Sequence, residues 1–288
     1  HGWHDWYLSS AIGKKDNLKF HLLPNLEIKG VPKSLRNTSF PFKYGDLKGL
    51  KKLILEKNIG IIKLEVCRNT KPNIKFLKEI RKICNKKNIV LIFDECTTGF
   101  RQSLAGLHNE IKIFPDIVIY GKAMGNGYPI NAVIGKKKIM TAASKTFISS
   151  TFWTERLGPS AALKTIHLME KNKTYLKVKS NGLKVMKIWK KLAKKHNINI
   201  KIYGIPSLAK FEIKSRDWPI LKSFIINEFL KKNILATNLF YPSVAHKPKY
   251  IKRYEKSLDL IFKKIKNNKN KLHELRFKKP IKEFNRLN

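Results

Sequence analysis

The chain has 288 residues, of which 42% are hydrophobic, so it can bury a sizeable core and is not expected to be disordered. Its net charge of +41 suggests a nucleic-acid partner, but only 9 of the 61 basic residues are arginine and the lysines are scattered, which favours a dispersed basic surface and no nucleic-acid binding. No apolar run is long enough to span a membrane, and three cysteines without metal-ligand spacing predict free thiols, no metal site and a cytoplasmic location.

Short apolar runs alternate with helical patterns along the first two-thirds of the chain. The runs predict strands over 61–64, 89–93, 117–120 and 131–134, and apolar residues at helical spacing predict a helix over 74–87. Another helix is expected from about 158 to 170, with Pro159 in its first turn. This order predicts an α/β fold with a mostly parallel sheet, in which ligands bind at the carboxyl ends of the strands.

The elements become shorter and more polar from about residue 172. A long basic helix is expected over 174–196, strands over 199–203, 208–213 and 234–238, and helices over 218–232 and 252–266. We therefore expect a large domain over 1–171 and a smaller α+β domain over 172–288.

Three predicted strands end in residues that carry chemistry. Glu65 follows the first strand, Asp94 the second, and Lys122 the third after a single glycine. Such a carboxylate and lysine could simply form a salt bridge. The alternative is a pyridoxal phosphate site, which needs a lysine amine for a Schiff base and a carboxylate beside the pyridine nitrogen. It also needs phosphate ligands near a helix N-terminus, and residues 149–159 supply hydroxyls just before the helix expected from 158.

The sequence contains several longer stretches that support the second alternative. They are, in order, HGWHDW (1–6), IIKLEVCRN (61–69), IFDECTTGFR (92–101), FPDIVIYGKAMGNGYPINAVIG (114–135), SSTFWTERLGPSAAL (149–163), FYPSVAHKPKYI (240–251) and a C-terminal FNRLN. Together with the 28-residue interval from Asp94 to Lys122, they resemble class III pyridoxal-phosphate aminotransferases of fold type I. The resemblance is to the branch that contains glutamate-1-semialdehyde aminomutase.

The resemblance implies a role for each residue of the cofactor site. Lys122 should form the Schiff base and later move the substrate's α-proton, and Asp94 should pair with the pyridinium nitrogen. Cys96 should pack on one face of the ring. Thr151 should reach the phosphate of the partner subunit's cofactor, so a homodimer with a shared site is expected. His1 and Gly2 match the end of an aromatic-His-Gly motif at the cofactor.

The sequence departs from the family pattern at two positions near the substrate. Glu65 matches the acid of a Glu-Pro element, but Val66 replaces the proline, so a structural salt bridge is an equal alternative. Asn238 stands where the aminomutases carry an acidic residue. The resemblance also implies missing N-terminal elements, so we expect an N-terminally incomplete fragment of a longer enzyme.

These observations leave three hypotheses about function. The first is pyridoxal-phosphate-dependent transamination of an amino acid or of an amino-sugar or aldehyde-type substrate through Lys122. The second is glutamate-1-semialdehyde 2,1-aminomutase activity, in which the amino group moves within one carbon skeleton. The third is a non-catalytic basic binding protein, against which the Asp94–Lys122 pair argues.

Overall fold

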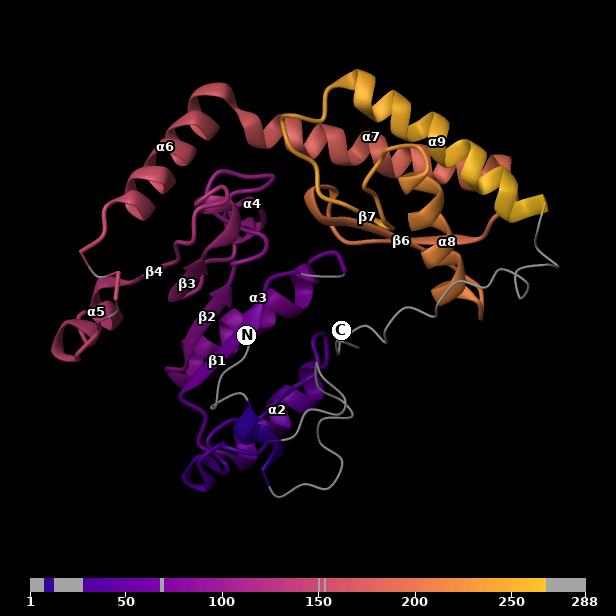
Figure 1. Ribbon diagram of the computed structural model, residues 1–288. Helices are drawn as coiled ribbons and strands as arrows, with labels where there is room; N and C mark the ends of the chain where they lie inside the picture. The colour runs from indigo at the N-terminus through magenta and orange to yellow at the C-terminus, as the bar shows by residue number, and fades with distance from the viewer. Residues whose placement is uncertain (1–7, 13–27, 68–69, 150, 153, 268–288) are drawn as a thin grey trace.

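The computed structural model describes residues 8–12, 28–67, 70–149, 151–152 and 154–267. Two sheets organise these residues, as Figure 1 shows. The first has the strand order β1-β2-β3-β4, with β1 (Ile61–Glu65), β2 (Val90–Asp94) and β3 (Ile117–Tyr120) parallel and β4 (Ala132–Gly135) antiparallel to β3. The four predicted strands of the first part are therefore confirmed, and so is a mostly parallel α/β sheet.

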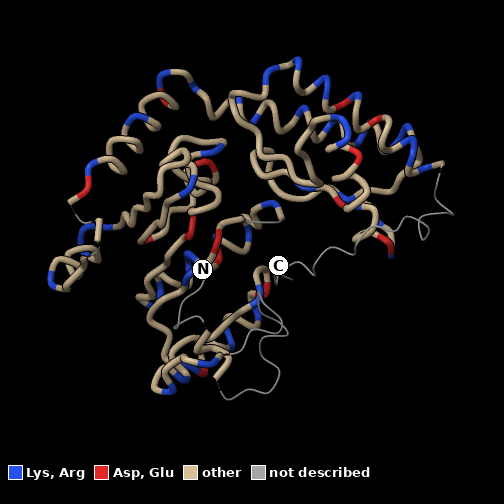
Figure 2. Tube along the Cα trace, viewed as in Figure 1, with Lys and Arg blue, Asp and Glu red and all other residues tan. Residues whose placement is uncertain are grey.

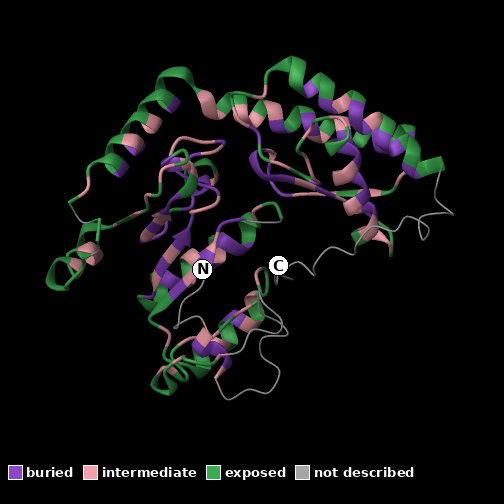
Figure 3. Ribbon diagram, in the orientation of Figure 1, coloured by how far each residue is buried: buried purple, intermediate pink, exposed green. Residues whose placement is uncertain are grey.

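Helix α3 (Ile74–Lys87) covers one face of this sheet. Its first turn is capped by Asn73, whose side chain accepts a hydrogen bond from the backbone N–H of Phe76 at 3.1 Å. Phe76, Leu77 and Ile80 recur at helical spacing and are almost completely buried against alternate residues of β1 and β2. Figure 3 shows this buried layer in purple along the strands. Burial of these side chains fixes which face of β1 and β2 points away from α3.

The remaining elements of the first part flank the sheet. Helix α6 packs Ala162 and Met169 against Val118 and Tyr120 of β3. It joins α7 through Lys173, whose left-handed φ of 47° ends one helix and begins the next. Besides α3, the helical elements described in this part are η1 (Ser9–Ala11), η3 (Lys33–Leu35), α2 (Leu47–Glu56), α4 (Leu107–Ile111), η4 (Lys122–Met124), α5 (Lys137–Met140), η5 (Ala143–Lys145) and α6 (Leu157–Asn172).

A second, antiparallel sheet organises the C-terminal part. It contains β5 (Ile200–Tyr203), β6 (Ala209–Ile213) and β7 (Leu239–Phe240). The short helix η6 (Pro206–Leu208) directly precedes β6. Helices α7 (Thr174–Lys195), α8 (Trp218–Leu230) and α9 (Pro248–Asn267) pack an apolar core against it. At the centre of this core the buried Trp189 Nε1 donates a hydrogen bond to Tyr254 Oη at 2.8 Å. Burial raises the pKa of Tyr254, so its hydroxyl stays protonated while its oxygen accepts the hydrogen bond from Trp189.

The predicted strand over 234–238 is wrong. The strand of this region is Leu239–Phe240, and next to it the backbone oxygen of Asn238 still accepts a hydrogen bond from the Phe211 N–H of β6 at 3.0 Å. The Asn238 side chain donates to the carbonyl oxygen of Phe211 at 2.9 Å and takes the place of a backbone partner. The apolar run before it does not form a buried strand, since Leu235 is 92% exposed.

Other predicted elements of the C-terminal part are confirmed with small changes in their ends. The predicted 252–266 helix begins earlier, at Pro248, which suits the first turn of a helix. The predicted 218–232 helix ends at Leu230. Among the described residues, no helix has the length and hydropathy that crossing a membrane requires.

Candidate active site

Lys122 is the first residue of η4, directly beyond the carboxyl end of β3. Its backbone adopts a left-handed φ of 47°, which costs a residue with a side chain about 1 kcal/mol or more and is common at functional sites. The Lys122 Nζ donates a hydrogen bond to Thr97 Oγ1 at 2.9 Å, and the residue is exposed. The amine is therefore held at the strand end while it stays accessible to a ligand.

Gly121 separates Lys122 from β3, and the space around it explains the absence of a side chain. A Cβ atom there would collide with Asn131 Oδ1 and would lie 2.8 Å from the Sγ of Cys96. The chain after β2, which carries Cys96, therefore approaches the backbone beside Lys122 closely. A glycine at this position lets the two strand ends meet.

Asp94 ends β2, and its Cα is in register with Ile119 of β3 on one side and with Glu65 of β1 on the other. The residue is 9% exposed. Its Oδ1 accepts a hydrogen bond from the backbone N–H of Cys96 at 3.1 Å, and its Oδ2 lies 3.5 Å from Lys63 Nζ. A lysine within β1 thus forms a salt bridge with Asp94, whereas the Lys122 amine donates to Thr97.

Glu95 follows Asp94 but points into the protein interior, where it is completely buried. Its Oε2 accepts from Thr98 Oγ1 at 2.5 Å and from the Leu107 N–H at 2.8 Å. Its Oε1 accepts from the N–H of His108 at 2.7 Å and faces His108 Nδ1 at 2.8 Å. Burial raises the pKa of Glu95, but hydrogen bonds from His108, Thr98 and Leu107 outweigh it and hold this pKa below its usual value. Glu95 therefore closes the segment from 95 to 108 into a fixed loop.

The same loop contacts the C-terminal part of the chain. Gln102 Oε1 accepts hydrogen bonds from the N–H and the hydroxyl of Ser207 at 3.3 and 3.2 Å, and both residues are buried. The Arg101 guanidinium lies over the ring of Tyr241, 5.6 Å from its centroid. The loop that carries Cys96 and Thr97 is thus bound at its far end to the region of the second sheet.

The structure brings together three of the predicted site residues, Asp94, Cys96 and Lys122, and places Glu65 at the neighbouring strand end. Thr151 is exposed in the turn before α6. Asn238 is 2% exposed and its side chain bonds the backbone of β6. His1 and Gly2 lie outside the described residues.

Sequence reasoning missed Lys63, Glu95 and Thr97. Lys63 stands inside an apolar run that predicts a buried strand, and this position could have marked it as unusual. The neighbouring acids Asp94 and Glu95 gave a partial signal, but the partner of Glu95 is His108, which only the fold brings close. Thr97 has no signal beyond its position after Asp94.

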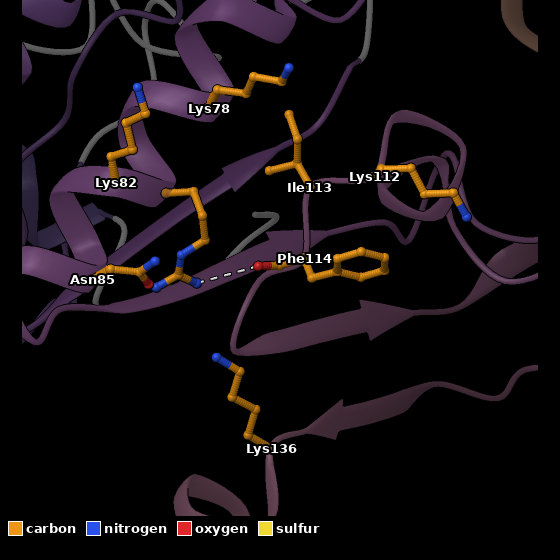
Figure 4. A pocket seen from close by; sticks show the side chains of 8 residues that line it. Lys78, Lys82, Asn85, Lys112, Ile113, Phe114 and Lys136 are labelled. Atoms are coloured by element: carbon orange, nitrogen blue, oxygen red, sulfur yellow. Dashed lines mark hydrogen bonds between the residues drawn. The ribbon is translucent and has the colours of Figure 1, made fainter.

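A basic hollow lies at the opposite end of the sheet from Lys122. Figure 4 shows lysines around it. The Arg81 guanidinium donates a hydrogen bond to the backbone oxygen of Phe114 at 3.4 Å. Arg81 and Lys136 pair with the buried Asp116 at 2.9 and 2.7 Å, so the charges of two cations that line the hollow are neutralised. Figure 2 shows Lys and Arg over nearly all elements, which makes such a lining unremarkable for this chain. Its residues are Lys78, Arg81, Lys82, Asn85, Lys112, Ile113, Phe114 and Lys136.

The fold is that of the pyridoxal-phosphate transaminases. The FumI protein of Sphingopyxis sp. MTA144, solved in its PLP internal aldimine form, matches with a TM-score of 0.77 at 20% identity, over 84% of this chain and 61% of that one. An omega-transaminase from Sphaerobacter thermophilus matches with a TM-score of 0.76 at 17% identity, over 91% of this chain and 66% of that one.

The chain belongs to the class-III aminotransferase family, whose family model matches residues 69–266. It is 32% identical over 257 residues to the 3-aminobutyryl-CoA aminotransferase of Cloacimonas acidaminovorans, covering 85% of this chain and 57% of that protein. It is also 32% identical over 267 residues to the glutamate-1-semialdehyde 2,1-aminomutase of Sulfurisphaera tokodaii, covering 90% of this chain and 58% of that protein. The chain thus spans less than two-thirds of the length of these relatives.

Proposed function

We propose that this chain carries the catalytic lysine of an enzyme that transfers amino groups with pyridoxal phosphate. The observation that carries this proposal is Lys122, an exposed amine on a left-handed backbone, fixed 2.9 Å from Thr97 at the strand end next to Asp94. Lys112 and Lys173 adopt a left-handed backbone where a helix ends, whereas Lys122 adopts it just after a strand, next to the close approach at Gly121.

The residues at this sheet edge fit the cofactor chemically. When bound, pyridoxal phosphate supplies an aldehyde that captures amines and a ring that accepts electrons. The Lys122 Nζ would be the amine that holds the cofactor aldehyde and, when free, the base that takes up the substrate's α-proton. The Asp94 carboxylate would hold the proton on the ring nitrogen. Cys96, whose sulfur lies beside Gly121, packs on one face of the ring.

The other predicted site residues take peripheral roles in the same proposal. Thr151 reaches the phosphate of the partner subunit's cofactor, supported by its exposed position before α6. Glu65 lies at the substrate side of the site, supported by its register with Asp94. The Asn238 amide donates to a backbone oxygen of β6. In this proposal Asn238 therefore acts near the substrate indirectly, by holding the chain around residue 238 in place. The expected cofactor contacts of His1 and Gly2 fall outside the described residues.

We also propose the domain division at 171 and 172 and a homodimeric assembly. The two sheets and the apolar core that α7, α8 and α9 form with the second sheet support the division, which falls next to the left-handed Lys173, while Ile205 and Leu208 join the core of the first sheet. Large apolar side chains that remain exposed before and along α6 support a partner surface beside Thr151. They are Phe147, Ile148, Phe152, Leu157 and Leu163, with exposed fractions from 59% to 97%. Free cysteines at 67, 84 and 96 support a reducing compartment such as the cytoplasm.

Reduction with borohydride tests the proposal directly. The purified protein that contains this chain is incubated with pyridoxal phosphate, reduced, digested and mapped by mass spectrometry. We expect a pyridoxyl group on Lys122 and none on the matched control Lys136, which lies at the other end of the sheet. Modification spread evenly over the surface lysines, without enrichment at Lys122, would refute the catalytic assignment.

Glutamate-1-semialdehyde 2,1-aminomutase activity is the second candidate, because several relatives carry that name and one is 36% identical over 182 residues. The 3-aminobutyryl-CoA aminotransferase relative and the uncharged Asn238 favour transfer between two molecules. Supplying glutamate-1-semialdehyde alone separates the two. Its conversion to 5-aminolevulinate without an added amino donor identifies the mutase, whereas a strict need for separate donor and acceptor identifies the aminotransferase.

A further inference from the structure

Lys63 is an unusual cation because it lies in the interior of β1. Its neighbours Ile62 and Leu64 point to the other face and are buried against α3. The Cα of Lys63 is in register with Ile92, two residues before Asp94 on β2, so alternation puts Lys63 and Asp94 on the same face. The lysine side chain runs forward along this face, and its Nζ lies 3.5 Å from Asp94 Oδ2.

The Lys63–Asp94 pair is largely withdrawn from water. The two side chains are 18% and 11% exposed. At the other end of the sheet Lys136, which pairs with Asp116, keeps 60% of its side chain exposed. Charges with little access to water interact more strongly than charges on the surface, because water screens them less. Lys63 therefore acts on Asp94 as a fixed local charge.

We propose that Lys63 is a positioning residue that sets how strongly Asp94 holds the proton on the ring nitrogen of the cofactor. This rests on the proposed function, in which Asp94 faces that nitrogen. One Asp94 oxygen is occupied by the Cys96 N–H at 3.1 Å, and Lys63 stands at the other. A carboxylate stabilises a positive ring nitrogen by attraction, and an ammonium group at the same carboxylate opposes that attraction.

Other charged groups surround Asp94 without replacing Lys63. Glu65 lies beside it on β1, the Cys96 thiol lies in the following loop, and Lys122 lies beyond β3. Two of these groups are part of the proposed chemistry, and Glu65 is an acid that adds to the negative charge. In this proposal Lys63, as a cation paired with Asp94, weakens the hold of Asp94 on the ring proton, orients the carboxylate and limits how readily the ring accepts electrons.

The test removes the charge while it keeps the shape. Lys63→Met retains the unbranched stem, Lys63→Gln gives a second neutral variant, and Lys63→Arg retains the charge. Lys136→Met is the matched control, since it breaks an ion pair remote from Lys122. For each variant the dissociation constant of pyridoxal phosphate is measured, and the ring nitrogen is titrated by NMR with nitrogen-15-labelled cofactor.

Both neutral variants should bind the cofactor about tenfold more tightly and release the ring proton about one pH unit higher than the parent protein. Lys63→Arg and Lys136→Met should stay close to the parent. A purely structural role would lower thermal stability but would leave the ring titration where it was. Neutral variants that bind equally or more weakly, with an unchanged titration, overturn the inference.

Borohydride fixation in the same samples keeps the two proposals apart. If Lys122 is labelled in the parent but neither neutral variant shifts the titration or the affinity, the role of Lys63 is refuted and the proposed function stands. If Lys122 is not labelled in the parent, the proposed function fails and the role of Lys63 fails with it.

Discussion

Replacement of Glu95 by alanine removes the acceptor of four hydrogen bonds inside the loop that follows β2. The backbone N–H groups of Leu107 and His108 and the hydroxyl of Thr98 would lose their partner in a site that water does not reach. An unsatisfied buried donor costs about 1–3 kcal/mol, and losing one side of a buried charged network costs about 3–5 kcal/mol. We therefore expect Glu95→Ala to lower the free energy of unfolding by about 3–5 kcal/mol.

Urea unfolding followed by circular dichroism measures this loss, provided that the slope against urea is unchanged. Glu79→Ala is the matched control. The Glu79 carboxylate pairs with Lys82 at 3.1 Å on the surface of α3, and such a pair contributes about 0.5 kcal/mol or less. A Glu95→Ala midpoint that coincides with the midpoint of Glu79→Ala would contradict the network described here.

The other predictions concern pH, the glycine beside Lys122 and the C-terminal core. Because the pKa of Glu95 is depressed in the folded protein, its stabilisation is complete above the unfolded value of about 4.3 and is lost as the pH falls through the folded value. The stability difference between parent and Glu95→Gln should therefore narrow in acid, as acid titrations of urea midpoints can show. Gly121→Ala should reduce pyridoxal phosphate uptake at Lys122 at least tenfold, because its Cβ collides with neighbouring atoms; unchanged uptake in an absorbance titration would oppose this. Tyr254→Phe leaves the buried Trp189 N–H unpaired and should cost about 1–3 kcal/mol in thermal unfolding, with an unaltered midpoint as the contrary result.

The sequence predicted those elements whose pattern is local. The strands at 61, 90 and 117 are short apolar runs, and α3 has both apolar spacing and an Asn73 cap, so each could be located without knowledge of the fold. The apolar run at 234–238 carries the same signal, but pairing with β6 involves only its last residue, Asn238, and a pattern does not show where pairing begins. Pairing depends on tertiary contacts.

The site residues also fall into those that the sequence predicts and those that only the fold reveals. Lys122 and Asp94 were predicted because they stand at strand ends within recognisable motifs. Lys63 was not, because in a chain with +41 net charge one more lysine is most simply a surface residue. Its orientation toward Asp94 follows from the register of β1 and β2, which pairs residues 29 positions apart. The inward turn of Glu95 likewise depends on His108, 13 residues later.

The contact between Gln102 and Ser207 gives the loop after β2 a mechanical role. One end of this loop is continuous with Asp94 and holds the Lys122 amine through Thr97, and the other end is bonded to the chain entering β6. Glu95 keeps the segment between them from stretching. Hydrogen bonds thus connect the lysine end of this loop to the chain that enters β6, so the position of the Lys122 amine depends on both halves of the described chain.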